Sequence, residues 1–305
     1  MNHTRSIVLL SALLLGTLVA GGCSTPEASY PTPQAAVDAL VASLEAPDRA
    51  GIEKVFGTDG AAILHSGDDV QDNITITEFL RQYQERHALV AADDDEMTLV
   101  VGPTDWPMPI PLRHEGSGWR FDVAAGEDEM LSRRIGRNEL TTIQVMLAIV
   151  DAQNDYAASG AGGPGAYAQR FLSTPGTRDG LYWPTAEGEP QSPLGELVAD
   201  AASEGYGTTA SAGARRPYHG YFYRILTSQG PDAPGGAMDY LQNGAMTGGF
   251  AAIAWPVQYG SSGIMTFLVS KQGVVYQADL GSGTDHTAAT MPSFNPDARW
   301  ALASQ

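Results

Sequence analysis

Apolar residues recur at helical spacing in the first part of the chain and then give way to short runs typical of strands. Thr32 can cap a helix with Pro33 in its first turn, whose apolar face comprises Val37, Leu40, Val41 and Leu44. A helix over 48–57 is expected to stop at Gly57, and another is expected from Thr75, where Glu78 completes a capping-box pattern. Strand patterns follow at 97–102, 110–115 and 118–126. Together these elements predict a small N-terminal α+β domain over residues 33–126.

The second part of the chain has the pattern of a long helix followed by strands. Asn138 can cap the helix, its apolar positions are Leu140, Ile143, Leu147 and Val150, and the glycine cluster at 160–165 ends it. Ser192 is expected to cap a further helix, with Pro193 in its first turn. Strand patterns then occupy 218–228, 248–257, 263–270 and 273–280, with Gly273 at a hairpin bend. The predicted C-terminal domain, 127–300, is a helix packed on an antiparallel meander, followed by a tail at 301–305. The fold class is therefore α+β.

An apolar run precedes both predicted domains and ends close to Cys23, the one cysteine among 305 residues. Residues 7–20 have the length of a signal-peptide core and are short for a membrane-spanning helix. Small residues stand directly before Cys23, an arrangement that resembles the bacterial lipobox, whose cysteine receives a diacylglycerol. We therefore expect a lipoprotein signal peptide over 1–22, acylation (palmitate) at Cys23, a tether over 23–32, and a membrane anchor made of acyl chains. Ser24 favours the outer membrane, with the protein facing the periplasm.

Charge and cysteine content exclude several classes of function. The chain has 35 acidic and 17 basic residues, a formal net charge of −18 at pH 7. A field of that sign repels phosphate backbones, so no nucleic-acid partner is expected. Once Cys23 is acylated, no thiol remains for a disulfide, a thiolate zinc site or a cysteine nucleophile.

Three clusters combine aromatic and polar residues and are candidate binding sites. The first spans 105–111, where prolines hold the chain extended beside Asp105 and Trp106. The second spans 178–184, where a turn at Asp179 is expected to present Tyr182 and Trp183. The third spans 216–224 and includes His219 and Tyr221, expected on the same face of a strand. Such clusters can form a groove for sugars or a peptide; the alternative is that the rings plug a glycine-rich core.

Acidic residues offer two further hypotheses. Clusters at 93–96 and 127–129 supply oxygen ligands for calcium but lack the spacing of an EF-hand loop, so they are interpreted as solvated surface. The alternative is a calcium site formed by Asp151, Asp155 and Asp179; otherwise no metal or cofactor is expected. Paired carboxylates such as Asp105 and Asp179 could hydrolyse a glycosidic bond if they lay about 5–10 Å apart across a groove.

Long sequence blocks carry a resemblance to a known family. In order they are DWPMPIPL, RRIGRNEL, YAQRF, TPGTRDGLYWP, PYHGYFYRILTSQGP and GGFAAIAWPVQYGSSGIMTF. They resemble the bacterial secreted family catalogued as domain of unknown function 2950, over about 33–300. The resemblance implies an envelope location and a two-part architecture, and it brings no catalytic residues. The first part is also similar to nuclear-transport-factor-like and cystatin-like cone folds, and the second to the heads of pilins and pseudopilins.

Three functions are consistent with these patterns. The first is a non-enzymatic envelope lipoprotein that binds a partner protein or an envelope polymer through its aromatic loops; it predicts that Trp183→Ala leaves the fold intact and abolishes partner recovery. The second is an envelope-polymer hydrolase that uses the carboxylates named above. The third is a pocket in the first domain that holds a small apolar ligand.

Overall fold

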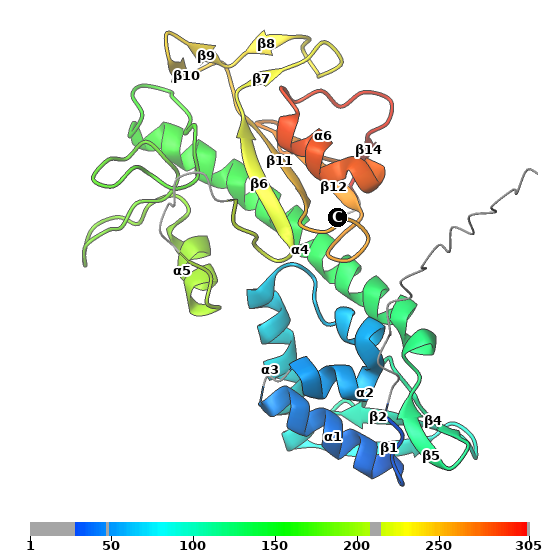
Figure 1. Cartoon of the computed structure of the whole chain (residues 1–305). Helices are drawn as coiled ribbons and strands as arrows, with labels where there is room; N and C mark the ends of the chain where they lie inside the picture. Colours follow the sequence, from blue (N-terminus) through cyan, green and yellow to red (C-terminus); the bar gives the residue numbers. More distant parts are fainter. Residues whose placement is uncertain (1–27, 47–48, 208–214, 304–305) are drawn as a thin grey trace, which may run out of the picture.

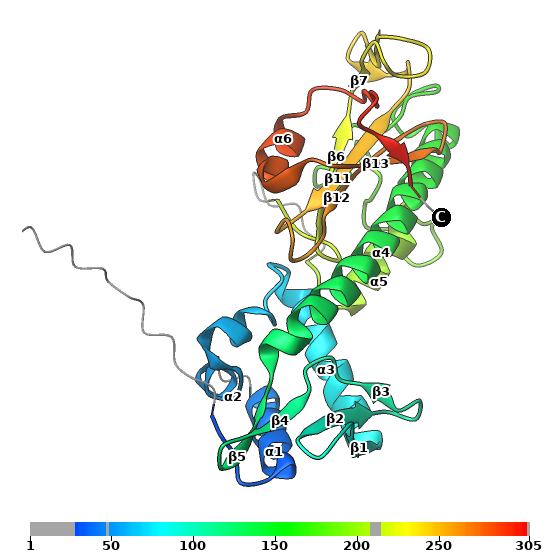
Figure 2. The same ribbon diagram turned by 90° about the vertical axis from the view of Figure 1, so that its right-hand side faces the viewer.

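A computed structural model describes residues 28–46, 49–207 and 215–303. The predicted signal peptide, Cys23 and the first half of the tether lie outside these ranges, as do residues 304 and 305. Two lobes lie at opposite ends of one long helix, α4 (Val123–Ser159), which runs alongside both (Figures 1 and 2). At about 1.5 Å per residue, its 37 residues span roughly 55 Å. None of the helices in the described ranges combines the length and apolar character needed to cross a bilayer.

The N-terminal lobe packs three helices against a small antiparallel sheet. The helices are α1 (Pro33–Glu45), α2 (Arg49–Ala62) and α3 (Asp69–Glu85). The strands are β1 (His87–Ala91), β2 (Glu96–Val101), β3 (Trp106–Pro107), β4 (Leu112–Glu115) and β5 (Gly118–Phe121), in the order β1-β2-β4-β5 with β3 also on β2. Their apolar faces form a core that includes Leu40, Phe56, Leu99 and Phe121. This lobe has the predicted α+β character.

The C-terminal lobe is an antiparallel sheet covered by helices on both faces. Its strands are β6 (Tyr221–Leu226), β11 (Ala251–Pro256), β12 (Met265–Ser270), β13 (Val275–Asp279) and β14 (Ala301–Leu302), in the order β14-β13-β12-β11-β6. Tyr223 bonds to Thr142 of α4, whereas the neighbouring Arg224 bonds to carbonyls at α6 (Thr284–Thr290) and beyond, so the two helices cover opposite faces. All six residues of β11 are buried, as expected for a strand covered on both sides.

Smaller elements decorate this sheet. A ribbon pairs β7 (Ser228–Gln229) with β8 (Met238–Asp239), and another pairs β9 (Leu241–Gln242) with β10 (Ala245–Met246). Helix α5 (Gly195–Ser203) and the 3-10 turn η1 (Gly281–Gly283) complete the lobe. The predicted hairpin is present between β12 and β13, with Gly273 at positive φ in its bend.

Helix bodies were predicted well, and several helix starts were wrong. Helix α3 begins at Asp69, capped by Asp68, and Thr75 lies inside it, donating its hydroxyl to the carbonyl of Gln71. Helix α4 begins at Val123, capped by Asp122, so Asn138 is a buried mid-helix residue. Ser192 makes no cap bond to α5.

Two strand assignments also change. Residues 87–91, expected as the end of a helix, form β1, and residues 123–126, expected as strand, are the first turn of α4. The stop expected at Gly57 is present, since its positive φ breaks α2 there, and a second helical segment follows after the kink and ends at Ala62. The boundary predicted at 126/127 therefore falls within α4, which belongs to both lobes.

Candidate ligand-binding groove

The residues predicted as a site lie in three separate places. Asp105 and Trp106 belong to the N-terminal lobe: Asp105 forms an ion pair with Arg86 at 3.2 Å, and Trp106 is 38% exposed. The guanidinium of Arg133 on α4 lies 5.1 Å from the centre of the Trp106 ring, and it also donates to the carbonyl of Pro107. Trp106 is thus held in place by α4 while part of the residue stays exposed.

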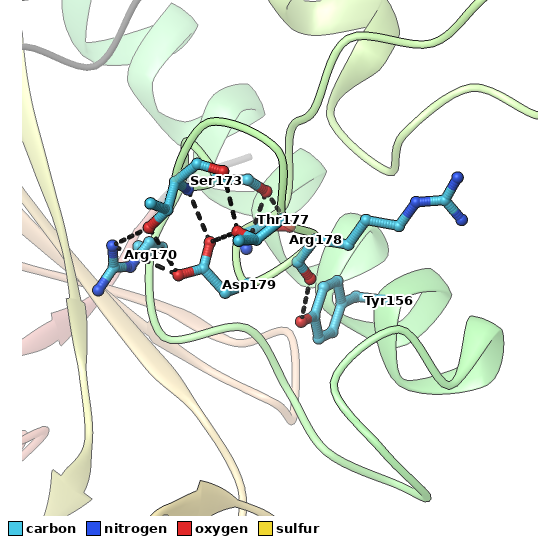
Figure 3. Close-up of polar contacts among 8 residues, drawn as sticks. Tyr156, Arg170, Ser173, Thr177, Arg178 and Asp179 are labelled. Atoms are coloured by element: carbon cyan, nitrogen blue, oxygen red, sulfur yellow. Dashed lines mark hydrogen bonds and ion pairs between the residues drawn. The ribbon is translucent and has the colours of Figure 1, made fainter.

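In the second cluster, hydrogen bonds to Asp179 hold a polar loop together (Figure 3). The Asp179 carboxylate accepts from the backbone N–H of Thr174 at 2.7 Å and from the hydroxyls of Thr174 and Thr177, and Arg170 lies 3.4 Å away. Partial desolvation raises the pKa of Asp179, but these hydrogen bonds outweigh it and the pKa lies below its ordinary value. An ionised, fully engaged carboxylate of this kind stabilises the loop and is poorly suited to act as a general acid.

Trp183 is buried rather than presented to solvent. It is 9% exposed and packs edge-on against Tyr156, in a small core with Leu181. The Tyr156 hydroxyl donates to the carbonyl of Arg178 at 2.7 Å, which ties the loop to α4 (Figure 3). Tyr182 is partly buried, and its backbone forms a β-bridge with Leu172 of the adjacent segment. The Trp183 ring therefore fills a core, as the plugging alternative expects.

Asp105 and Asp179 cannot act as a pair. The segment after Asp105 is held at position 133 of α4, and the Asp179 loop is held at position 156, about 35 Å further along the helix. Glycoside hydrolysis requires carboxylates about 5–10 Å apart. The hydrolase hypothesis built on this pair is therefore wrong. In the described part of the chain no group of three or more His, Cys, Asp or Glu residues is placed to hold a metal ion, so Asp151, Asp155 and Asp179 are not brought together as a calcium site.

His219 and Tyr221 lie where the two lobes meet, but they do not share a surface. Tyr221 is fully buried in the sheet and donates to the carbonyl of Met265. The His219 ring contacts the N-terminal lobe, with Nδ1 at 2.6 Å from Oε1 of Gln71, and its Nε2 lies 3.3 Å from Glu204. The expected common face fails because Tyr218–Tyr221 is a tight turn with His219 at positive φ, and alternation begins only at Tyr221.

A buried carboxylate organises this junction. Asp68, 0% exposed, caps α3 and accepts from the Tyr206 hydroxyl at 2.9 Å and from the Gly220 N–H at 2.8 Å. Desolvation, followed by the proximity of Asp68, raises the pKa of Tyr206, which keeps its hydroxyl protonated and donating. Desolvation also lowers the pKa of His219, against the opposing influence of Glu204 and Asp68. Asp68, Tyr206 and His219 therefore form contacts that hold the two lobes together.

An apolar groove of about 420 Å³ lies in the N-terminal lobe. Leu40 and Phe56 contribute to it from the core, Phe79 from α3, and Trp106 and Met108 from the first aromatic cluster. Its polar lining comes mainly from α3 and from Arg137 of α4. Of the three predicted clusters, the one at 105–111 lines this groove. The sequence analysis did not identify Phe79 and Arg137 as residues that line the groove with it.

A glycine allows the cluster to lie this close to α4. A Cβ atom built on Gly126 would be 2.6 Å from the Cα of Ile110 and 2.7 Å from the carbonyl oxygen of Pro109. Real Cβ atoms do not approach backbone so closely, so any larger residue would push the 109–110 segment away from the helix. The wall of the groove depends on this contact.

Comparison with known proteins gives a family and nothing more specific. A family model described as "Protein of unknown function (DUF2950)" matches residues 27–302, nearly the whole of the described chain. No curated protein and no solved structure matches.

Proposed function

The chain belongs to the DUF2950 family, whose description assigns no activity, and we propose from the groove that it is a non-enzymatic binding protein of the cell envelope. In this proposal the chain is anchored by lipid at Cys23, faces the periplasm, and takes an apolar ligand into the groove of the N-terminal lobe. The observation that carries the proposal is the position of Trp106, a large ring left 38% exposed at the wall of an apolar groove.

The size and lining of the groove support ligand binding. Sites for small molecules typically occupy about 300–1,000 Å³, are mainly apolar, and contain a few polar groups that orient the ligand. The groove has a volume of about 420 Å³, an apolar floor at Leu40 and Phe56, and Gln71 and Arg137 among its few polar groups. Each methylene group moved from water into such a site contributes about 0.8 kcal/mol.

The chemistry of the lining favours recognition over catalysis. The carboxylate that lines the groove, Glu78, already accepts from Arg81 at 2.8 Å and from Gln82 at 2.7 Å. These hydrogen bonds lower the pKa of Glu78 to about 2, which leaves a weak base and no acid at neutral pH. Binding through Trp183, which is buried, is not part of this proposal.

A matched pair of substitutions on α3 tests the groove directly. Thr75 and Thr77 are both exposed, but only Thr75 lines the groove. We expect Thr75→Trp to fill the groove and weaken binding of the apolar fluorophore N-phenyl-1-naphthylamine at least tenfold, whereas Thr77→Trp leaves it unchanged. The chain without residues 1–22 is used, so that the apolar run does not bind the probe. If the fluorophore does not bind, or if the two variants weaken binding equally, the groove is not the ligand site.

A further inference from the structure

We propose that the ligand of the groove is a single-chain amphiphile with an anionic head, of the fatty-carboxylate type, and that Arg137 binds its head group. This inference rests on the proposed function and adds the chemical class of the ligand. It is drawn from the charges along the groove.

Arg137 differs in its contacts from Arg133 and Arg134, its neighbours on α4. Arg133 donates to Glu129 and to the carbonyl of Pro107, and Arg134 donates to Ser261 and to the carbonyl of Ile63. Within the described ranges Arg137 makes no hydrogen bond and no ion pair within 4 Å, although it is exposed and lines the groove. Three arginines on one stretch of helix thus include two that hold the fold and one that is free to bind a ligand.

Neither Asp72 nor Glu78, the acids nearest to Arg137 along α3, forms an ion pair with it. Asp72 is the acid that exerts an electrostatic effect on it, but the Asp72 oxygens accept from the N–H and the hydroxyl of Ser66, at 2.9 and 2.7 Å. Glu78, further along α3, is paired with Arg81. An anionic head at Arg137 therefore gains a charge-assisted hydrogen bond, the strong and often bidentate kind that a guanidinium forms with a carboxylate.

Arg137 and Trp106 lie at opposite ends of the groove. Gln71 and Arg137 lie at the end near the lobe junction, since Gln71 contacts His219 and the charge of Arg137 acts on the same histidine. Gln82 and Trp106 lie at the other end: Arg86, in the turn of chain after Gln82, pairs with Asp105. Along α3, positions 71 and 82 are about 16 Å apart. An extended chain with its head at Arg137 would place its tail against Trp106.

A hydrocarbon chain suits this lining better than a peptide. A buried peptide backbone presents an N–H and a C=O at every residue, and each one left unpaired costs about 1–3 kcal/mol. Between its two ends the groove offers mainly Ile74, Phe79 and Met108, whose side chains form no hydrogen bonds with a backbone. An acyl chain has no such groups to satisfy.

Two probes with the same chain and different heads test the inference. Decanoate and 1-decanol are titrated calorimetrically, at pH 8, into the chain without residues 1–22 and into its Arg137→Gln and Arg299→Gln variants. We expect the parent chain to bind decanoate at least tenfold more tightly than decanol, although its net charge, −19 once Arg5 is removed with residues 1–22, repels anions. Arg137→Gln should abolish this preference and leave decanol affinity unchanged, which also shows that the variant is folded. Arg299→Gln changes the net charge equally on an exposed side chain paired with Asp297 and should alter neither affinity.

The outcomes separate this inference from the proposed function. If both probes bind with equal affinity and Arg137→Gln changes neither, the anionic head is refuted while the groove remains the ligand site. If Arg299→Gln reduces decanoate binding as much as Arg137→Gln does, the effect is one of net charge and the role of Arg137 is refuted. If neither probe binds, the inference and the proposed function both fail.

Discussion

Replacing Asp68 with alanine should uncouple the two lobes. The carboxylate is fully buried and belongs to the N-terminal lobe, and two of its three hydrogen-bond donors, the Tyr206 hydroxyl and the Gly220 N–H, come from the C-terminal lobe. The third donor is the N–H of Gln71 in the first turn of α3. Alanine removes all three acceptor contacts and leaves the donors in a buried site with no partner.

The cost can be worked out from these contacts. A hydrogen bond to a charged group contributes about 1.5–3 kcal/mol, so the two inter-lobe bonds are together worth roughly 3–6 kcal/mol. Loss of the helix cap adds about 1 kcal/mol. Asp69→Ala is the matched control: Asp69 lies in the first turn of the same helix but is exposed, so its loss should cost only about 0.3–1 kcal/mol through the helix dipole.

Urea unfolding and hydrogen exchange measure the two parts of this prediction. The extrapolated free energy of unfolding should fall by several kcal/mol in Asp68→Ala and by less than about 1 kcal/mol in Asp69→Ala. Amide exchange should accelerate in the first turn of α3 and in 218–220, while the central strands β11 and β12 keep their protection. If Asp68→Ala unfolds at the same urea concentration as Asp69→Ala, or if exchange rises equally throughout both lobes, the assignment of Asp68 as the link between lobes is wrong.

Three further predictions concern residues in other parts of the chain. Trp183→Ala should lower the free energy of unfolding by about 3–5 kcal/mol, since Trp183 packs on Tyr156 in a small core; unchanged thermal unfolding would contradict its burial. Arg81→Gln should raise the pKa of Glu78 from about 2 towards 4.5, as measured by carboxyl carbon NMR. Because the folded pKa is depressed, the stability this pair contributes is present above pH 4.5 and is lost as the pH falls towards 2, so an Arg81→Gln effect on thermal unfolding that persisted at pH 2 would contradict the pairing. Cys23→Ala should abolish incorporation of labelled palmitate into the protein; incorporation that persisted in this variant would exclude lipid attachment at Cys23.

Periodic patterns predicted helix bodies and strands because a buried face must repeat at the period of its element. Helix starts were harder, because several residues in one stretch can act as a cap and tertiary contacts select among them. Thr75 and Glu78 match a capping box, yet Asp68 takes the position because its carboxylate also bonds to the other lobe. Asn138 could cap a helix, but it lies within α4, where its amide donates to the carbonyl of Ser262.

The groove was only partly visible in the sequence. The cluster at 105–111 indicated a binding site because a tryptophan among prolines is hard to bury. Its partners lie on other elements, Phe56 on α2, Phe79 on α3 and Arg137 on α4, and no local spacing connects them. The same reasoning failed for Trp183, which was expected to be presented to solvent but is buried under a polar loop. Aromatic content therefore predicted which segments hold large rings, and only the packing of α4 decided which of them is accessible.

The position of Arg137 connects the groove to the lobe junction. Gln71 lines the end of the groove at which Arg137 lies, and it also contacts His219 of the C-terminal lobe at 2.6 Å. Gln71 further donates its backbone N–H to Asp68, the residue that holds the lobes together. An anionic head bound at Arg137 would therefore lie beside the contacts that fix the lobe orientation. Since Arg137 lowers the pKa of His219, neutralising its charge with such a head group would raise that pKa and strengthen the attraction between His219 and Glu204 within the junction.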